Sequence, residues 1–172
     1  IYYKPGSLKA EICRKGRAAL LDFCQEHSVS HELCGKVVVA LNESELPALE
    51  KIRERSIANG AQVEGLVKEQ LAEIEPHVAG IRALRVPETG IVDYRGMCDV
   101  LARLITEAGG EVRFGAKVKS LIAPGDGYIV ETSRGAIQTK RVVNCAGLHS
   151  DRVAECFGDD PEAKIIPFRG EY

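Results

Sequence analysis

The chain has 172 residues, enough for one domain or two small ones, and 45% of them are hydrophobic, as in an ordinary globular protein. The formal net charge of −2 excludes the broad basic field of a nucleic-acid-binding protein. No apolar run is long enough to span a bilayer, no signal peptide is visible, and none of the four histidines stands at a metal-ligand spacing, so we expect no metal.

Six cysteines stand at positions 13, 24, 34, 98, 145 and 156, without a C-x-x-C pair. This pattern favours reduced core thiols in a cytosolic type of protein over a disulfide framework. We therefore expect a cytoplasmic location and leave open a peripheral association with the inner membrane. The lack of an initiator Met and the abrupt ends suggest an internal piece of a longer protein.

Capping signals predict the elements of the first half of the chain. Ser7 is an N-cap candidate for a helix over residues 8–27. Asn42 and Glu45 form a capping-box pattern before a second helix, which Gly60 ends. We also predict strands at 36–40 and 82–86, a short strand or turn at 63–67 and a short helix at 68–74.

The second half begins with a helix that Asp93 caps and Gly109-Gly110 ends. After it, extended segments dominate, and the turn at Ser133-Arg134-Gly135 joins two of them as a hairpin. The predicted strands are 111–114, 116–122, 128–132, 136–139, 142–145 and 164–168, with a short helix at 150–157.

The most informative segment is Val142-Val143-Asn144-Cys145-Ala146-Gly147, in which a β-branched run ends at two small residues before a helix. Neither Ala nor Gly blocks the approach of a ligand to the backbone. The carboxyl ends of sheet strands are where α/β proteins hold nucleotides. The glycine fingerprint G-x-G-x-x-G is absent from the sequence, so the segment supplies only half of a nucleotide site.

Four segments, in this order along the chain, resemble FAD enzymes of the D-amino-acid oxidase superfamily. Together they resemble the L-2-hydroxyglutarate oxidase/dehydrogenase family, and the resemblance covers essentially the whole chain. The segments are Ile1–Ala10, Gly90–Tyr94, Val142–Asp151 and Pro167–Tyr172.

The resemblance implies an α/β fold of mixed α+β character. A partial FAD-binding domain of the glutathione-reductase type, with a β-meander, would be interleaved with part of a mixed-sheet substrate domain. Residues 1–30 and 91–158 would belong to the FAD-binding domain. Residues 31–90 and 159–172 would belong to the substrate domain.

The resemblance also implies FAD as cofactor and a 2-hydroxy acid as substrate. The reaction would be oxidation of L-2-hydroxyglutarate to 2-oxoglutarate by hydride transfer to flavin N5. Val118 would contact adenine through its backbone, and Cys145, Ala146 and Gly147 would line the cofactor.

Arg169 is the candidate partner of a substrate carboxylate, since a guanidinium binds a carboxylate in bidentate fashion, although a surface ion pair is about equally compatible with a lone Arg. Tyr2 and Tyr3 would help to shape the substrate pocket. The general base stays unassigned, and oxygen or a quinone remains open as electron acceptor.

Two alternatives remain at this stage. The same FAD scaffold serves amino-acid and amine oxidases and glycerol-3-phosphate dehydrogenases. A non-redox nucleotide-binding or interaction module would explain the missing glycine fingerprint. Because that fingerprint is missing, we expect the isolated chain to bind FAD poorly, to be inactive and to self-associate through exposed apolar surface.

Overall fold

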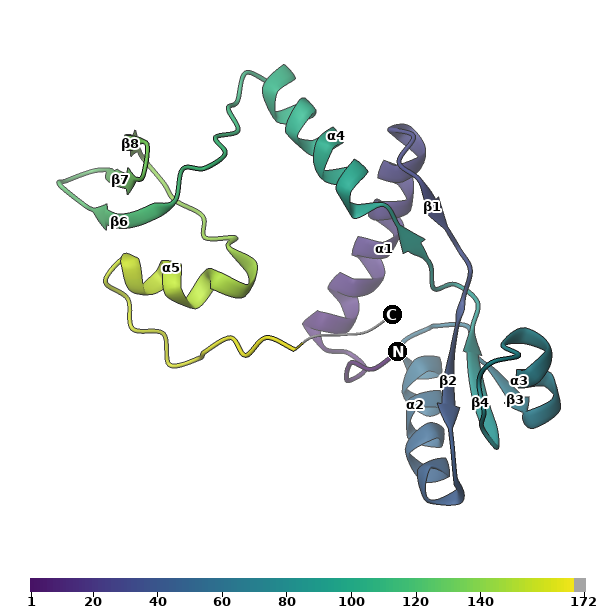
Figure 1. Ribbon diagram of the computed structural model, residues 1–172. Coiled ribbons are helices and arrows are strands. Elements are labelled where there is room, and N and C mark those ends of the chain that lie inside the picture. The colour runs from purple at the N-terminus through teal and green to yellow at the C-terminus, as the bar shows by residue number, and fades with distance from the viewer. Residues whose placement is uncertain (169–172) are drawn as a thin grey trace. The chain divides into compact units, whose positions relative to one another are not determined.

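The computed structural model describes residues 1–168, and the chain divides into two compact units at Gly110 (Figure 1). The elements of the first unit are α1 (Leu8–Glu26), β1 (His31–Glu32), β2 (Lys36–Ala40), α2 (Leu46–Ala58), β3 (Glu64–Val67), α3 (Lys68–Ile74), β4 (Arg82–Val86), β5 (Ile91–Val92) and α4 (Tyr94–Glu107). Those of the second are β6 (Val118–Ile122), β7 (Tyr128–Thr132), β8 (Gly135–Thr139) and α5 (Ser150–Cys156). Short 3₁₀ helices at Glu43–Glu45 and Gly147–His149 precede α2 and α5.

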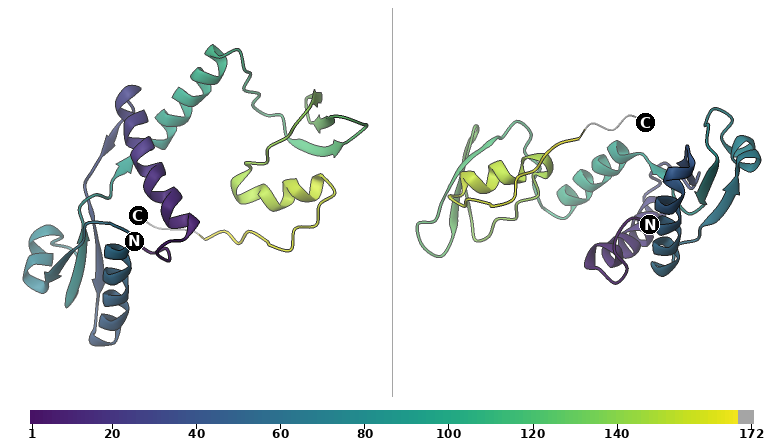
Figure 2. Two further views of the ribbon diagram at one scale, coloured as in Figure 1. Left: turned by 180° about the vertical axis from the view of Figure 1, so that it is seen from behind. Right: turned by 90° about the horizontal axis from the view of Figure 1, so that it is seen from below.

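An antiparallel sheet with the order β2-β4-β3 forms the centre of the first unit. In the register of this sheet, Val38 faces Leu84 across the β2–β4 pair, and Leu66 faces Ala83 across the β3–β4 pair. Helix α2 packs on one side of the sheet and α3 on the other, and the views in Figure 2 show the strands between the two helices. The sheet is therefore the middle of three layers.

The alternation of side chains along the strands separates two small cores. On the α2 side, Ala40, Leu49 and Leu84 are buried together, and Val38 packs against them. On the α3 side, a second cluster joins Leu66, Leu71 and Ala83, with Val37 and Val39 against it. Because both faces are covered, β2 is apolar at four consecutive positions rather than at every second one.

The predicted caps of α1 and α4 are confirmed. Asn42 caps the 3₁₀ helix Glu43–Glu45 that leads into α2, whereas α2 itself begins after Glu45 and has no side-chain cap hydrogen bond. The side chain of Ser7 accepts a hydrogen bond from the Ala10 backbone N–H (3.3 Å), and that of Asn42 accepts one from Ser44 (3.1 Å). Asp93 accepts hydrogen bonds from the backbone N–H groups of Arg95 (3.1 Å) and Gly96 (3.0 Å) in the first turn of α4. In an ideal capping box the Glu45 carboxylate would accept a hydrogen bond from the backbone N–H of Asn42. Here it accepts instead from the backbone N–H of Leu41, one residue earlier (2.7 Å).

In the second unit, β6, β7 and β8 form an antiparallel meander, and α5 packs against β6. The predicted hairpin is confirmed, with Gly135 at a positive φ of 105° in the turn. The hydroxyl of the buried Thr132 donates to the Gly135 carbonyl (2.6 Å) and accepts from the Arg134 N–H (3.0 Å). These bonds fix the turn from inside.

Three of the predicted strands, 111–114, 142–145 and 164–168, are not strands. An extended segment becomes a strand only when a neighbouring strand pairs with its N–H and C=O groups. None of the strands described in residues 1–168 pairs with these segments. In the middle segment Val143 is accordingly 82% exposed.

None of the helices between residues 1 and 168 combines the length and the apolar character that crossing a membrane requires.

Leu71→Ala tests the core on the α3 side. Leu71 is 1% exposed, so its truncation leaves a cavity and should lower the free energy of unfolding by about 2–5 kcal/mol in urea denaturation. Leu8, which is 70% exposed on α1, provides the matched control, and Leu8→Ala should change stability by less than about 0.5 kcal/mol. Equal effects of the two substitutions would contradict the described core.

Candidate cofactor and substrate sites

Val118, the first predicted cofactor contact, begins β6 at the edge of the meander. Among the strands described up to residue 168, β6 pairs only with β7, so one edge of its backbone has no strand neighbour. An irregularity in the pairing between Val118 and Ser120 lies at the same place. Edge-strand N–H and C=O groups are free to bind another partner, and a backbone contact to an adenine ring needs this freedom.

Ser133, in the hairpin turn, holds the segment that leads into β6. Its hydroxyl accepts a hydrogen bond from the Lys117 N–H (2.9 Å) and donates one to the Gly115 carbonyl (2.8 Å). Its own N–H donates to the Lys117 carbonyl (2.9 Å). The backbone just before Val118 is thus fixed by a residue 16 positions further along the chain.

The other predicted contacts, Cys145, Ala146 and Gly147, lie between the extended segment and α5. Asn144 spans this loop with one side-chain amide. The amide nitrogen donates to the Ser150 carbonyl (2.8 Å), and the amide oxygen accepts from the Ala146 N–H (3.2 Å). The loop therefore has a defined backbone course although it pairs with no strand in the described part of the chain.

Gly147 gives this loop an open backbone surface. Its φ of 56° lies in the left-handed region, and no heavy atom lies within 4 Å of the position that a Cβ would take. Because α5 packs against β6, the strand edge at Val118 and the loop at Gly147 belong to one unit. A free strand edge and a loop without side-chain bulk fit a planar cofactor that is approached by backbone atoms.

Asp151, near the start of α5, binds the segment that follows this helix. Its carboxylate accepts hydrogen bonds from the backbone N–H groups of Ile165 (3.1 Å) and Arg152 (2.8 Å). The bond from Ile165, followed by that from Arg152, lowers the pKa of Asp151 below its ordinary value. Asp151 lies in the first turn of α5, where a negative charge interacts favourably with the helix dipole, and the bond from Ile165 adds a tertiary contact.

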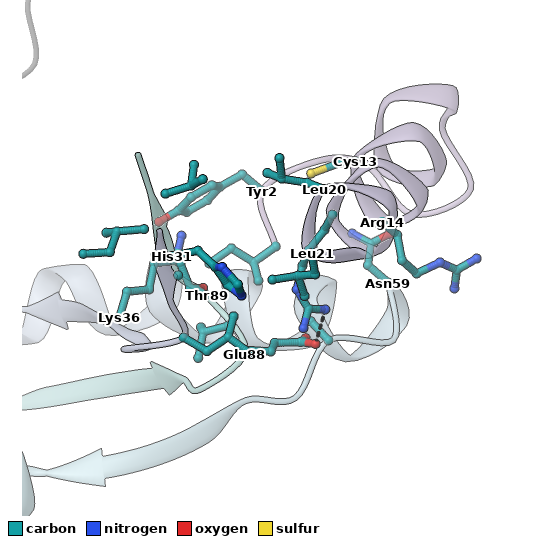
Figure 3. Close-up of a pocket in the computed structure, with 18 of the residues that line it drawn as sticks. Tyr2, Cys13, Arg14, Leu20, Leu21, His31, Lys36, Asn59, Glu88 and Thr89 are labelled. Carbon is teal, nitrogen blue, oxygen red and sulfur yellow. Dashed lines mark hydrogen bonds and ion pairs between the residues drawn. The ribbon is translucent and has the colours of Figure 1, made fainter. Parts of the chain in front are cut away.

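The first unit contains a cavity of about 510 Å³ lined by Tyr2 and Tyr3, the two predicted pocket residues (Figure 3). Hydrogen bonds hold this N-terminal segment against α2. The Arg55 guanidinium donates to the Tyr2 carbonyl (2.8 Å), and the Asn59 side chain donates to the Tyr3 carbonyl (2.9 Å). Helix α1, the β1–β5 pair and the turn after β4 supply the other walls.

Glu88 crosslinks three segments at the wall of this cavity. Its carboxylate forms an ion pair with Arg17 of α1 (2.7 Å), drawn as a dashed line in Figure 3, and accepts a hydrogen bond from the Gln62 N–H (3.0 Å). Arg17 and Glu88 are 71 positions apart, and no local pattern links them. Sequence patterns therefore do not predict this pair.

Lys36, the first residue of β2, also lines the cavity and was not among the predicted site residues. Its ammonium lies over the ring of Tyr2, 4.7 Å from the ring centroid. No local sequence pattern links Lys36 to Tyr2, and the two residues meet only in the folded chain. Arg169, the predicted carboxylate partner, lies outside the described residues.

Among the groups found in residues 1–168, no three His, Cys, Asp or Glu side chains are placed to hold a metal ion.

Comparisons with known proteins define the class. The family model of FAD dependent oxidoreductases of the DAO type matches residues 1–172. The glycine oxidase structure from Geobacillus kaustophilus superimposes with a TM-score of 0.81 at 21% identity, over 91% of this chain and 44% of that one. The chain belongs to the DAO family of FAD dependent oxidoreductases, and its fold is a mixed α/β part of the flavoenzyme fold of this type.

Within this class, the chain is similar to proteins named L-2-hydroxyglutarate dehydrogenase. It is 42% identical to the one from Indibacter alkaliphilus over 174 residues, and 39% identical to the mitochondrial one from Homo sapiens over 185 residues. Both alignments include the whole of this chain but only 44% and 40% of the relatives. The chain thus spans less than half the length of these relatives. Membership in the family confirms FAD as the cofactor and disfavours a non-redox module.

Gly147→Ala tests the loop as a cofactor contact in the full-length protein. The new Cβ should occupy the space open to the cofactor and weaken FAD binding about tenfold or more, measured by flavin fluorescence titration of the apoprotein.

Gly158→Ala is the matched control for this substitution. Gly158 also has a positive φ (78°) and an open Cβ position, at the other end of α5. Both variants should lose about 1 kcal/mol of stability through backbone strain, and only Gly147→Ala should lose FAD affinity. If the Gly147→Ala and Gly158→Ala variants bound FAD with equal affinity, Gly147 would not be a cofactor contact.

Asp151→Asn should show a pH-dependent effect on stability. Since the folded-state pKa of Asp151 lies below the unfolded one, its stabilisation is complete above the unfolded pKa and is lost as the pH falls through the folded pKa. Urea unfolding midpoints of wild type and variant should therefore differ most near neutral pH and converge in acid. Asp126→Asn, in the exposed turn before β7, serves as control. A difference that stays constant with pH would contradict the role of the Asp151 charge.

Proposed function

We propose that the protein oxidises the 2-hydroxyl of L-2-hydroxyglutarate to give 2-oxoglutarate, with FAD as cofactor. The observation that carries the proposal is the similarity of the whole chain, at 42% and 39% identity, to two proteins named L-2-hydroxyglutarate dehydrogenase. The likeness to glycine oxidase, at 21% identity, supports the fold alone.

FAD, when bound, supplies the acceptor for the hydride that leaves the substrate carbon. The part of this chain is to hold the cofactor and the substrate. We assign the adenine contact to the free backbone edge at Val118 and the lining of the cofactor to Cys145, Ala146 and Gly147. The open Cβ position of Gly147 and the Asn144 hydrogen bonds support this assignment.

We assign the cavity lined by Tyr2 and Tyr3 to the substrate. Its volume of about 510 Å³ is in the range of small-molecule sites. The hydrogen bonds from Arg55 and Asn59 support a fixed position for both tyrosines. Arg169 is the proposed partner of a substrate carboxylate, with oxygen or a quinone as the electron acceptor.

The proposal includes the domain division expected from the sequence. Residues 31–90 and 159–172 would belong to the substrate domain, and both core clusters of the β2-β4-β3 sheet fall within the first of these ranges. Residues 1–30 and 91–158 would belong to the FAD domain, which would contain all four predicted cofactor contacts. The proposal also includes a cytoplasmic location, and peripheral association with the inner membrane is compatible with it. Its support is the sequence pattern of six cysteines without a C-x-x-C pair. The expectation that these thiols lie in the core holds only for Cys24, because Cys13, Cys34, Cys98 and Cys145 are exposed and Cys156 is half-buried.

The decisive experiment uses the full-length protein under anaerobic conditions. It should purify yellow, and L-2-hydroxyglutarate should bleach its flavin absorbance because the substrate reduces the flavin. D-2-hydroxyglutarate, glycine and glycerol 3-phosphate serve as controls and should leave the spectrum unchanged. A colourless protein, or bleaching by glycine or glycerol 3-phosphate alone, would overturn the proposal.

A further inference from the structure

We propose that Lys36 binds one carboxylate of the substrate in the cavity of the first unit, and so selects dicarboxylates over monocarboxylates. The inference rests on the proposed function and adds to it the side chain that recognises the substrate.

The surroundings of Lys36 leave its charge without an anion. The side chain is half-buried, and its ammonium lies over the face of the Tyr2 ring at 4.7 Å from the centroid. Within residues 1–168 the ion pairs found at this cavity do not include Lys36. A cation–π contact offsets only part of the desolvation of an ammonium, so the site favours an incoming anion.

The carboxylates of the cavity wall do not supply that anion. Glu88 is already bound to Arg17 and to the Gln62 N–H. Glu32 is exposed at the strand edge and forms no ion pair with Lys36 at 4.0 Å or less.

The other side chains at the wall that carry or can take a positive charge are Arg14, Arg17 and His31. Figure 3 shows the guanidinium of Arg14 directed away from Tyr2 and His31. The guanidinium of Arg17 is held by its ion pair with Glu88 at 2.7 Å. The Nδ1 atom of His31 lies 2.9 Å from the Val29 carbonyl oxygen, which it contacts as a donor. Lys36 is therefore the cation that lies beside Tyr2 at this wall and that forms no ion pair with the carboxylates of the wall.

The fold determines where this ammonium lies. Lys36 is two residues before Val38 on β2, so the alternation of the strand places both on the α2 side of the sheet. Val86, opposite Lys36 in the register, is buried and lines the same cavity. Leu20 and Leu21 of α1 add apolar wall, which suits the short carbon chain between two carboxylates.

The test measures binding of glutarate and of its monomethyl ester to the full-length holoenzyme by calorimetry. Neither probe has a hydroxyl to oxidise, and the two differ by one negative charge. Lys36→Met should weaken glutarate binding about tenfold to a hundredfold and leave the ester nearly unchanged, because a charge-assisted hydrogen bond is lost for one probe only. Lys36→Arg should keep most of the preference for glutarate.

The controls separate recognition from stability. Lys51→Met, exposed on α2, should leave both affinities unchanged, and Lys36→Gln is a second neutral variant should the Met variant fold poorly. An unchanged ratio of the two affinities in the neutral variants that retain flavin would overturn the inference, as would an equal loss for both probes. If wild type binds glutarate through Lys36 but does not oxidise L-2-hydroxyglutarate, the proposed function fails and the inference about Lys36 stands.

Discussion

The first unit depends on the pairing of β4 with a strand on each side. All five of its residues pair with β2, and four of them also pair with β3, so the backbone groups of β4 are satisfied within the sheet. Its side chains alternate between the two cores, with Leu84 toward α2 and Ala83 toward α3. Without this central strand neither helix would have a surface to pack on, and the walls of the cavity would separate.

Local signals in the sequence were enough for the helices and for the strands that pair nearby. Ser7, Asn42 and Asp93 each cap a helix by a contact two or three positions away, so the information lies within one turn. Residues 142–145 show the limit of such signals. Their β-branched pattern indicates an extended backbone, as found, but a strand also needs a neighbour, and no local pattern specifies one.

The two candidate sites differ in the same way. The loop at Ala146-Gly147 was predictable because small residues at a turn are a local signal, and the structure adds the Asn144 amide that fixes its course. The cavity charges were not predictable. Arg17 and Glu88 meet across 71 positions, and Lys36 meets Tyr2 only because the N-terminal segment is held on α2. Such pairs depend on the complete tertiary fold, and no local sequence pattern predicts them.

The position of Lys36 at the first residue of β2 also bears on how this protein family could diversify. The core side of the strand is occupied by Val38 and Ala40, two and four residues further on, so exchange of the side chain at position 36 leaves the core packing intact. A one-residue insertion between Lys36 and Val38 would instead place these two side chains on opposite faces of the sheet. A point substitution at position 36 can therefore change the ligand that this cavity prefers without disturbing the core, whereas a change in the length of β2 cannot.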